Sequence, residues 1–325
     1  MVLSAGLVLL VASAVVSICT GSSDITICQL IRCLVRPENA GVELAVLKYV
    51  RLPRTLACVF AGAALGVSGA IMQSVLANKL ASPGIIGVNA GAGLGITLCC
   101  AFGAASGFVY SLSAFIGSVV AVLMITAAAY KTKASRTTVI LGGVAVNAVL
   151  NAFSEAISVL NNDAALMSVD FRVGGFSSVS YIKLIPAMAI IALCLILLMT
   201  LMNDLEVLTM GDETARGLGM NVRRTKNLLL ILGALMAGAA VSFSGLLGFI
   251  GLVVPNFVRR LFPGNAKLTV AGSAVFGSIF LTFSDILARV IFAPFELPVG
   301  IIMAFVGGPV FIVLLVKGKG GHTYA

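Results

Sequence analysis

The stretch Leu246-Leu-Gly-Phe-Ile-Gly-Leu-Val-Val-Pro-Asn-Phe-Val258 decides the fold, because the number of membrane crossings depends on how it is read. It is apolar, but its 13 residues are too few for a full crossing, which takes about 20 apolar residues in a helix. Pro255 also interrupts helical hydrogen bonding. The stretch therefore predicts a short or broken helix lodged inside a bundle, where neighbouring segments satisfy the interrupted backbone.

The composition of the whole chain is that of a multispanning membrane protein. Of its 325 residues, 60% are hydrophobic and 10% are charged, and the mean hydropathy is +1.13, whereas about 25% of residues are charged in a soluble domain. We expect an all-α protein with a single transmembrane domain over residues 1–325. Nine full crossings are predicted by the apolar runs Met1–Ser23, Thr55–Ala77, Gly84–Tyr130 (two crossings with a break near Gly103–Gly107), Thr137–Leu160, Leu184–Asn203, Asn227–Gly245, Leu268–Ala288 and Leu297–Val316.

The distribution of positive charge favours a tenth crossing at Leu246–Val258. Lys and Arg prefer the cytoplasmic side of short loops. With ten crossings and a cytoplasmic N-terminus, 13 basic residues lie inside and 8 outside; without the tenth, 9 lie inside and 12 outside. Ten crossings place the segment 204–226 in the cytoplasm and the loop 24–54 outside. The net charge of +9 then reflects this topology and the anionic lipid headgroups of the bilayer, and nucleic acid is not an expected partner.

The N-terminal run and the cysteines suggest no other class of protein. The run lacks the positive n-region and the A-x-A-like cleavage site of a secretory signal, so it is predicted to be the first membrane helix. The 7 cysteines lie mostly in apolar runs and have no metal-ligand spacing. Cys28 and Cys33 share an outer loop, and whether they pair stays open.

A polar island follows the sixth predicted crossing. It reads Gly211-Asp-Glu-Thr-Ala-Arg-Gly-Leu-Gly-Met220 and continues as Asn-Val-Arg-Arg-Thr-Lys226. Asp212 and Glu213 at a helix start complement the helix dipole, and the basic residues after them mark the membrane boundary. Such an island in a hydrophobic chain predicts an attachment point for another protein, and the alternative is an ordinary solvated loop.

Two crossings share a small-residue pattern. Ala61-Gly-Ala-Ala-x-x-x-Ser68-Gly69 recurs as Ala237-Gly-Ala-Ala-x-x-x-Ser244-Gly245, in the second and seventh crossings. Helices five crossings apart run in opposite directions, so the echo predicts an inverted-topology repeat, a common construction in transporters. Chance is the alternative, because small residues are frequent in helices that pack closely in membranes.

The sequence contains no catalytic constellation. The only histidine, His322, lies in the polar C-terminal tail, and no Ser, Lys or His arrangement could build a nucleophile. There is no Walker-type Gly-x-x-x-x-Gly-Lys-Ser/Thr motif, so any ATP hydrolysis belongs to a separate subunit. We expect no enzyme activity, no cofactor and no metal site.

Several motifs resemble those of the FecCD-type permeases, the membrane subunits of ABC importers for iron–siderophores, haem and cobalamin. These motifs extend from about residue 50 to residue 310 in family order. They are Arg51-Leu-Pro-Arg54, Ala61–Gln73, Asn78-Lys-Leu-Ala-Ser-Pro-Gly84 through Gly91, Gly211-Asp-Glu-x-Ala-Arg216-x-Leu-Gly219, Gly248-Phe-Ile-Gly-Leu-Val-Val-Pro255, Ser284-Asp-Ile-Leu-Ala-Arg289 and Glu296-Leu-Pro-Val-Gly300. Two features depart from the family: Asn256 stands where His is usual, and the usually Trp-rich segment reads Phe171-Arg-Val-Gly-Gly-Phe-Ser177.

The resemblance implies a type II ABC importer permease in the cytoplasmic membrane of a prokaryote. Such a permease pairs with a second copy or a close paralogue, binds an ABC ATPase subunit below and receives ligand from an extracytoplasmic substrate-binding protein. The ligand would be an iron–siderophore complex, or haem or cobalamin. The competing hypothesis is a stand-alone secondary transporter of a small solute, which would not need the polar island.

The resemblance also implies roles for individual residues. The ATPase-coupling residues would be Gly211, Asp212, Glu213, Ala215, Arg216, Leu218 and Gly219. The inner gate of the translocation path would lie at Asn78 and Leu80. Arg51, Arg54 and Arg289 would dock the binding protein, whereas the alternative is that the first two anchor a helix at the headgroups and Arg289 pairs with Asp285, four residues away.

Overall fold

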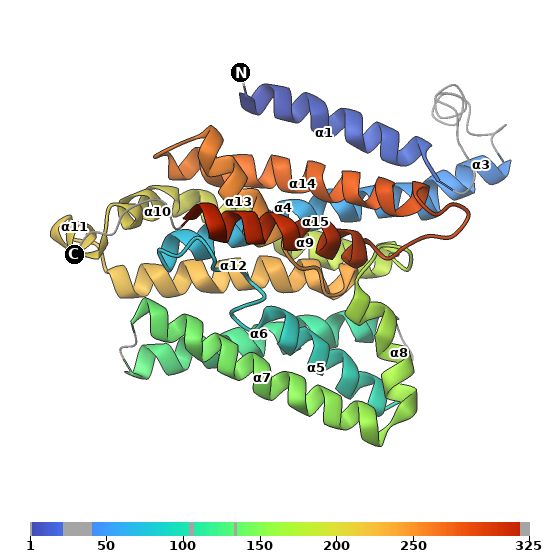
Figure 1. The fold of residues 1–325 in the computed structure, drawn as a ribbon, viewed down its shortest axis with the longest axis horizontal. Helices are drawn as coiled ribbons and strands as arrows, with labels where there is room; N and C mark the ends of the chain where they lie inside the picture. The colour runs from blue at the N-terminus through green and yellow to red at the C-terminus, as the bar shows by residue number, and fades with distance from the viewer. Residues whose placement is uncertain (1, 22–40, 104–106, 133–134, 319–325) are drawn as a thin grey trace.

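The computed structural model describes residues 2–21, 41–103, 107–132 and 135–318, and these form helices and turns without a strand (Figure 1). Cys28, Cys33 and His322 lie outside the described residues. The helices are α1 (Val2–Cys19), α3 (Gly41–Val46), η2 (a π-helical turn, Leu47–Arg51), α4 (Leu52–Val75), α5 (Val88–Ala101), α6 (Gly107–Thr132), α7 (Arg136–Leu160), α8 (Asn162–Val173), α9 (Tyr181–Thr200), α10 (Met202–Thr209), α11 (Asp212–Gly217), α12 (Val222–Ser244), α13 (Ile250–Leu261), α14 (Ala266–Val290) and α15 (Val299–Gly318).

The two helices that carry the repeated motif, α4 and α12, form the centre of the bundle. Figure 1 shows α1 along one edge and α5, α6 and α7 along the opposite edge. Small residues let α4 approach its neighbours closely: a side chain at Gly62 would collide with the backbone of Gly277 in α14, and one at Gly69 with the backbone of Gly251 in α13. Glycine at these positions therefore sets the spacing of the central helices.

The stretch that decides the crossing number does cross the bundle. Its beginning lies at the end of α8, where the Leu246 amide donates to the Phe171 carbonyl at 2.9 Å. The end of α13 lies beside the C-terminal end of α4, where Arg259 Nη1 donates to Gln73 Oε1 at 2.7 Å. The next helix, α14, begins beside α10, with Lys267 Nζ 3.1 Å from Glu206 Oε2. The chain therefore returns to the end that holds the polar island, as ten crossings require.

Apolar length agrees with that count. Seven of the described helices are long and apolar enough to cross a membrane, and α5 and the described part of α15 are shorter apolar helices. Together with α13 they account for the ten predicted crossings. The predicted break near Gly103–Gly107 is confirmed, because α5 ends at Ala101 and α6 begins at Gly107. The short helix α8 was not predicted; it starts at the Asn161 side chain, which accepts a hydrogen bond from the Ala164 amide.

The contacts of α4 and α12 agree with the predicted inverted repeat. Gly62 and Gly238 are matching positions of the two motifs. A side chain at Gly62 would meet Ser278 of α14, and one at Gly238 would meet Ser118 of α6. Both serines follow a glycine, and their helices are the ninth and fourth crossings, again five apart. Matching glycines thus face matching Gly-Ser pairs, through the backbone of Gly277 and Ser278 at Gly62 and through the Ser118 hydroxyl at Gly238, and the inverted repeat stays a prediction.

Candidate functional site

Two short helices, α10 before the polar island and α11 within it, lie at one end of the bundle, the left end in Figure 1. Helix α10 and helix α11 are joined at Gly211, whose φ of 113° favours glycine, and Gly219 after α11 has a φ of 81°. These two predicted coupling residues therefore shape the segment by their backbone conformation. Ala215 is fully buried and fastens α11 to the bundle.

Asp212, the first residue of α11, ties the segment to two membrane helices. Its carboxylate forms ion pairs with Arg136 at the start of α7 and with Lys226 in the first turns of α12. Burial raises the pKa of Asp212, but the hydrogen bonds from Lys226 and Arg136 outweigh this effect, so the pKa lies below its usual value. The side chain thus stays ionised and faces the permease itself.

The opposite face of the segment is open to solvent. Leu218 is 66% exposed and Met210 63% exposed, although both lie outside the long apolar helices. Glu213 is exposed as well. These exposed side chains lie on a segment that the Asp212 ion pairs hold in place, so they are available for contact with another protein.

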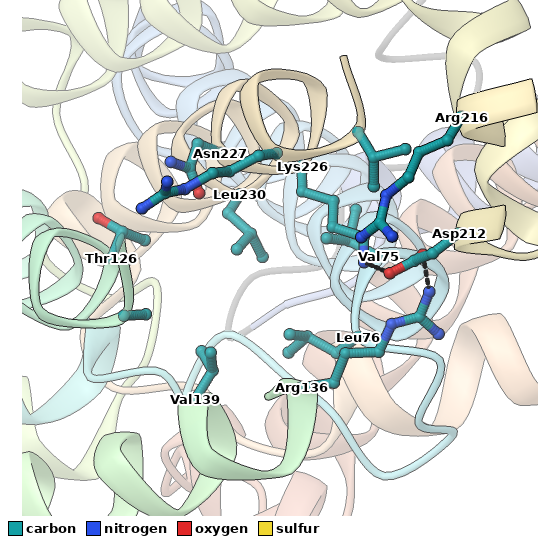
Figure 2. Close-up of a pocket in the computed structure, with 13 residues that line it drawn as sticks. Val75, Leu76, Thr126, Arg136, Val139, Asp212, Arg216, Lys226, Asn227 and Leu230 are labelled. Carbon is teal, nitrogen blue, oxygen red and sulfur yellow. Dashed lines mark hydrogen bonds and ion pairs between the residues drawn. The ribbon is translucent and has the colours of Figure 1, made fainter. Parts of the chain in front are cut away.

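A cavity of about 330 Å³ lies between this segment and the bundle (Figure 2). Its polar rim includes the Asp212 ion pairs, and Figure 2 shows the Arg216 side chain pointing toward them from α11. The residues that line it are Val75, Leu76, Thr126, Ala129, Arg136, Val139, Asp212, Arg216, Val222, Arg223, Lys226, Asn227 and Leu230.

The predicted gate residues lie in the turn between α4 and α5. The Asn78 side chain accepts a hydrogen bond from the Leu80 amide at 2.8 Å, and Ala77 before it has a φ of 45°. Asn256 of α13, which stands where the family usually has His, donates to the Lys79 carbonyl at 2.8 Å. The turn is therefore held against α13 by an amide side chain, and its role as a gate stays a prediction.

The three arginines predicted to dock a binding protein gather at the other end of the bundle, and all are buried. Arg51 is 4%, Arg54 8% and Arg289 5% exposed. Asp285 accepts hydrogen bonds from Arg54 Nε at 3.0 Å and Nη2 at 2.9 Å, and its second oxygen lies 2.9 Å from Arg289 Nη2. Arg54 Nη1 also lies 2.7 Å from Glu296 Oε2.

The same cluster reaches the first helix. Arg289 donates to Ser17 Oγ at 2.9 Å and to the Thr20 carbonyl at 2.6 Å, and Arg51 also donates to that carbonyl. The predicted pairing of Arg289 with Asp285 is confirmed. Arg54 contacts protein carboxylates and is covered by protein, so it does not extend to the headgroups as the anchoring alternative proposes. Docking of a binding protein requires accessible guanidinium groups, and the burial of Arg51, Arg54 and Arg289 does not favour it. The docking role of these arginines therefore stays a prediction.

Arg172 of α8 forms a polar cluster that the sequence analysis missed. Its Nη2 donates to Thr97 Oγ1 at 3.1 Å, Ser154 Oγ at 2.7 Å and Ser158 Oγ at 3.1 Å. Within the described parts of the chain, no carboxylate lies at ion-pair distance from it. The signal was the single charge in the stretch Phe171–Ser177. The cluster joins α5, α7 and α8 through hydroxyl groups.

Comparison with known proteins places this geometry in a family. The model of the FecCD transport family matches residues 9–317. The chain is 36% identical over 301 residues to the Fe(3+)-citrate import system permease protein YfmD of Bacillus subtilis, covering 92% of this chain and 89% of that protein. It is 35% identical over 276 residues to the hemin transport system permease protein HmuU of Yersinia pestis, covering 83% of each. It is 32% identical over 299 residues to the ferric enterobactin permease FepG of Escherichia coli, covering 92% and 90%.

A solved structure agrees. An inward-facing metal-chelate type ABC transporter superposes with a TM-score of 0.86 at 26% sequence identity, covering 97% of this chain and 99% of that one. Its fold is that of a type II ABC importer permease, and with its apolar helices the chain is a multi-pass protein of the cytoplasmic membrane. From the family match over nearly its whole length, the chain belongs to the FecCD transport family.

Proposed function

We propose that this chain is the membrane-spanning permease subunit of an ABC importer that moves an iron–siderophore complex into the cytoplasm. Family membership and the iron-chelate and haem permeases among its relatives support this reading. The observation that carries it is the segment α10–α11, which Asp212 fastens to α7 and α12 while Leu218 stays 66% exposed.

The coupling role follows from the way this segment is held. A rigid-body movement of a docked ATPase reaches the membrane helices only if the coupling segment is firmly attached to them. Asp212 supplies two ion pairs, and buried Ala215 adds a packing contact. Because Arg136 begins α7 and Lys226 lies near the start of α12, a displacement of α11 would act directly on both membrane helices. The exposed Glu213 and Leu218 would then contact the ATPase.

The proposed assembly has two copies of the permease, two ATPase subunits on the cytoplasmic side and one binding protein outside. The path would lie between the copies and would be lined by small and apolar groups. The turn at Asn78 and Leu80 would close its inner end, held by the hydrogen bond from Asn256 to Lys79. ATP hydrolysis takes place on the ATPase, and the permease itself contributes no catalytic group.

Reconstitution tests this proposal. The permease is placed in proteoliposomes with its cognate ATPase inside and its binding protein outside, and uptake of a ⁵⁵Fe-loaded siderophore is measured with and without ATP. We expect uptake only when ATP and both partners are present. Uptake driven by an ion gradient, with neither partner required, would show a secondary transporter and overturn the proposal.

A further inference from the structure

Three cationic side chains converge on one carboxylate at the inner end of the bundle. Arg136 and Lys226 pair with Asp212, and Arg216 points toward the same group from α11 (Figure 2). Among the described residues Arg216 has no ion-pair partner of its own. One carboxylate cannot neutralise three cations, and like charges this close repel one another. The cluster therefore favours a further anion.

The cavity beside this cluster has room for an anion and a short apolar attachment. It measures about 330 Å³, near the lower end of the volume range of about 300–1,000 Å³ that is typical of ligand pockets. Thr126 and Asn227 can add neutral hydrogen bonds, whereas most of the other walls are apolar: Val75, Leu76, Ala129, Val139, Val222 and Leu230. A fully hydrated ion gains nothing from such walls, but a group that carries both phosphate and hydrocarbon does.

The cavity lies where two candidate membrane helices begin. Arg136 is the first residue of α7, and Lys226 and Asn227 lie in the first turns of α12; both helices are long and apolar enough to cross a membrane. Basic pockets between membrane helices on the cytoplasmic side suit anionic headgroups, and guanidinium groups pair well with phosphate oxygens. We infer that this cavity binds the phosphate group of an anionic phospholipid from the inner leaflet, with Arg216 as a principal contact.

The inference does not depend on the transported ligand. It assigns a lipid site to the corner where α11 meets α7 and α12, so the local lipid would contribute to the rigidity of the coupling segment. A soluble phosphate could supply the same oxygen atoms, and a carboxylate of the ATPase could reach the exposed Arg216. The experiment is designed to separate these sources.

The full-length permease is purified in an uncharged detergent and titrated with short-chain phosphatidylglycerol, with short-chain phosphatidylcholine and with inorganic phosphate. Thermal unfolding follows binding, because a ligand that binds the folded protein raises its midpoint. Arg216→Gln removes the unpaired cation. Arg224→Gln is the control for Arg216→Gln. Arg224 is also an exposed arginine of the polar island, but it does not line the cavity. Asp212→Asn removes the resident carboxylate.

We expect phosphatidylglycerol to stabilise the wild type, with the other two probes much weaker. Arg216→Gln should raise the required lipid concentration about tenfold, as for the loss of one charge-assisted hydrogen bond, and Arg224→Gln should leave it unchanged. Asp212→Asn should lower it severalfold, because the competing anion is gone. Equal stabilisation by inorganic phosphate and by phosphatidylglycerol would overturn the lipid assignment. Equal effects of Arg216→Gln and Arg224→Gln on lipid binding would overturn it too. The same holds if Arg216→Gln loses ATPase binding but keeps its affinity for the lipid. If Asp212→Asn does not fold, the two arginine variants decide alone.

Discussion

Asp285 and Arg54 lie 231 residues apart in the chain, yet the carboxylate of one meets the guanidinium group of the other at 2.9 Å in a site closed to solvent. Asp285 is fully buried and also pairs with Arg289. The carboxylate thus joins the outer end of α14 to the start of α4, and Arg289 extends the connection to the end of α1.

The first prediction concerns this carboxylate. Asp285→Asn would leave two buried guanidinium groups without their shared anion, and breaking a buried pair in this way costs about 3–5 kcal/mol. We expect a large fall in the thermal midpoint of the purified permease. Glu296→Gln is the control, because Glu296 pairs with Arg54 but its side chain is 34% exposed, so its effect should be small. Equal midpoints for the wild type and Asp285→Asn would show that the cluster does not stabilise the fold.

The second prediction separates the internal role of the arginines from the docking role. Arg54→Glu would place a third carboxylate beside Asp285 and Glu296, so we expect a low yield of folded protein. The protein that does fold should bind its substrate-binding protein with unchanged affinity, insensitive to ionic strength. An affinity loss that is greatest at low salt, where screening is weakest, and that a Glu→Arg change on the binding protein restores, would instead support docking.

Much of the membrane topology could be predicted from the sequence because hydropathy and charge act locally. Pro255 and the short apolar stretch around it predicted a short helix, and the count of basic residues predicted that it crosses. The ends of this helix were less predictable. The predicted stretch was Leu246–Val258, whereas α13 runs over Ile250–Leu261 and follows Phe249, which has a left-handed backbone conformation. The close approach of α4 to its neighbours could be predicted because its small residues leave room for their backbones.

The polar contacts could not be predicted, because they depend on how distant segments meet. Family resemblance drew attention to Arg54 and Arg289 but suggested that they face a partner, whereas the fold turns both toward Asp285. The resemblance implies a role in ATPase coupling for Asp212, and the structure shows that its carboxylate contacts α7 and α12. Arg172 was passed over because its partners are hydroxyl groups, which leave no charge pattern in the sequence.

The third prediction tests the topology. Single cysteines are introduced at Ser178, Thr214 and Pro263, which are exposed in the structure, in a variant whose 7 native cysteines are all replaced by serine. A membrane-impermeant maleimide added to intact cells should label position 178 and leave positions 214 and 263 unlabelled until the membrane is opened. External labelling at position 263 would mean that α13 does not cross, and the crossing number would be nine.

The fourth prediction follows from the pKa of Asp212. Hydrogen bonds from Lys226 and Arg136 hold this pKa below its usual value despite the effect of burial. A lowered folded-state pKa stabilises the fold above the unfolded pKa of about 3.9, and the contribution is lost as the pH falls through the folded value. The thermal midpoint of Asp212→Asn should therefore lie below that of the wild type at pH 7, and the difference should shrink as the pH falls below about 3.9. A difference that does not change with pH would assign the effect of the variant to something other than the ion pairs.

The fifth prediction concerns the coupling surface. Leu218 is exposed at the end of α11, and complete burial of an exposed leucine side chain under a partner contributes about 1.5–3 kcal/mol. We expect Leu218→Asp to weaken ATPase binding at least about tenfold and to abolish ATP-driven uptake, while the variant remains folded because the side chain makes little contact within the permease. Leu261→Asp is the matched control, since this leucine is 38% exposed at the same end of the bundle but lies outside the coupling segment. Binding is measured by co-purification of the ATPase and coupling by stimulated ATP hydrolysis. Normal uptake by Leu218→Asp would show that α11 is not the coupling element. Loss of uptake in both variants would indicate a general effect of added negative charge at this end of the bundle and would not support a special role for α11.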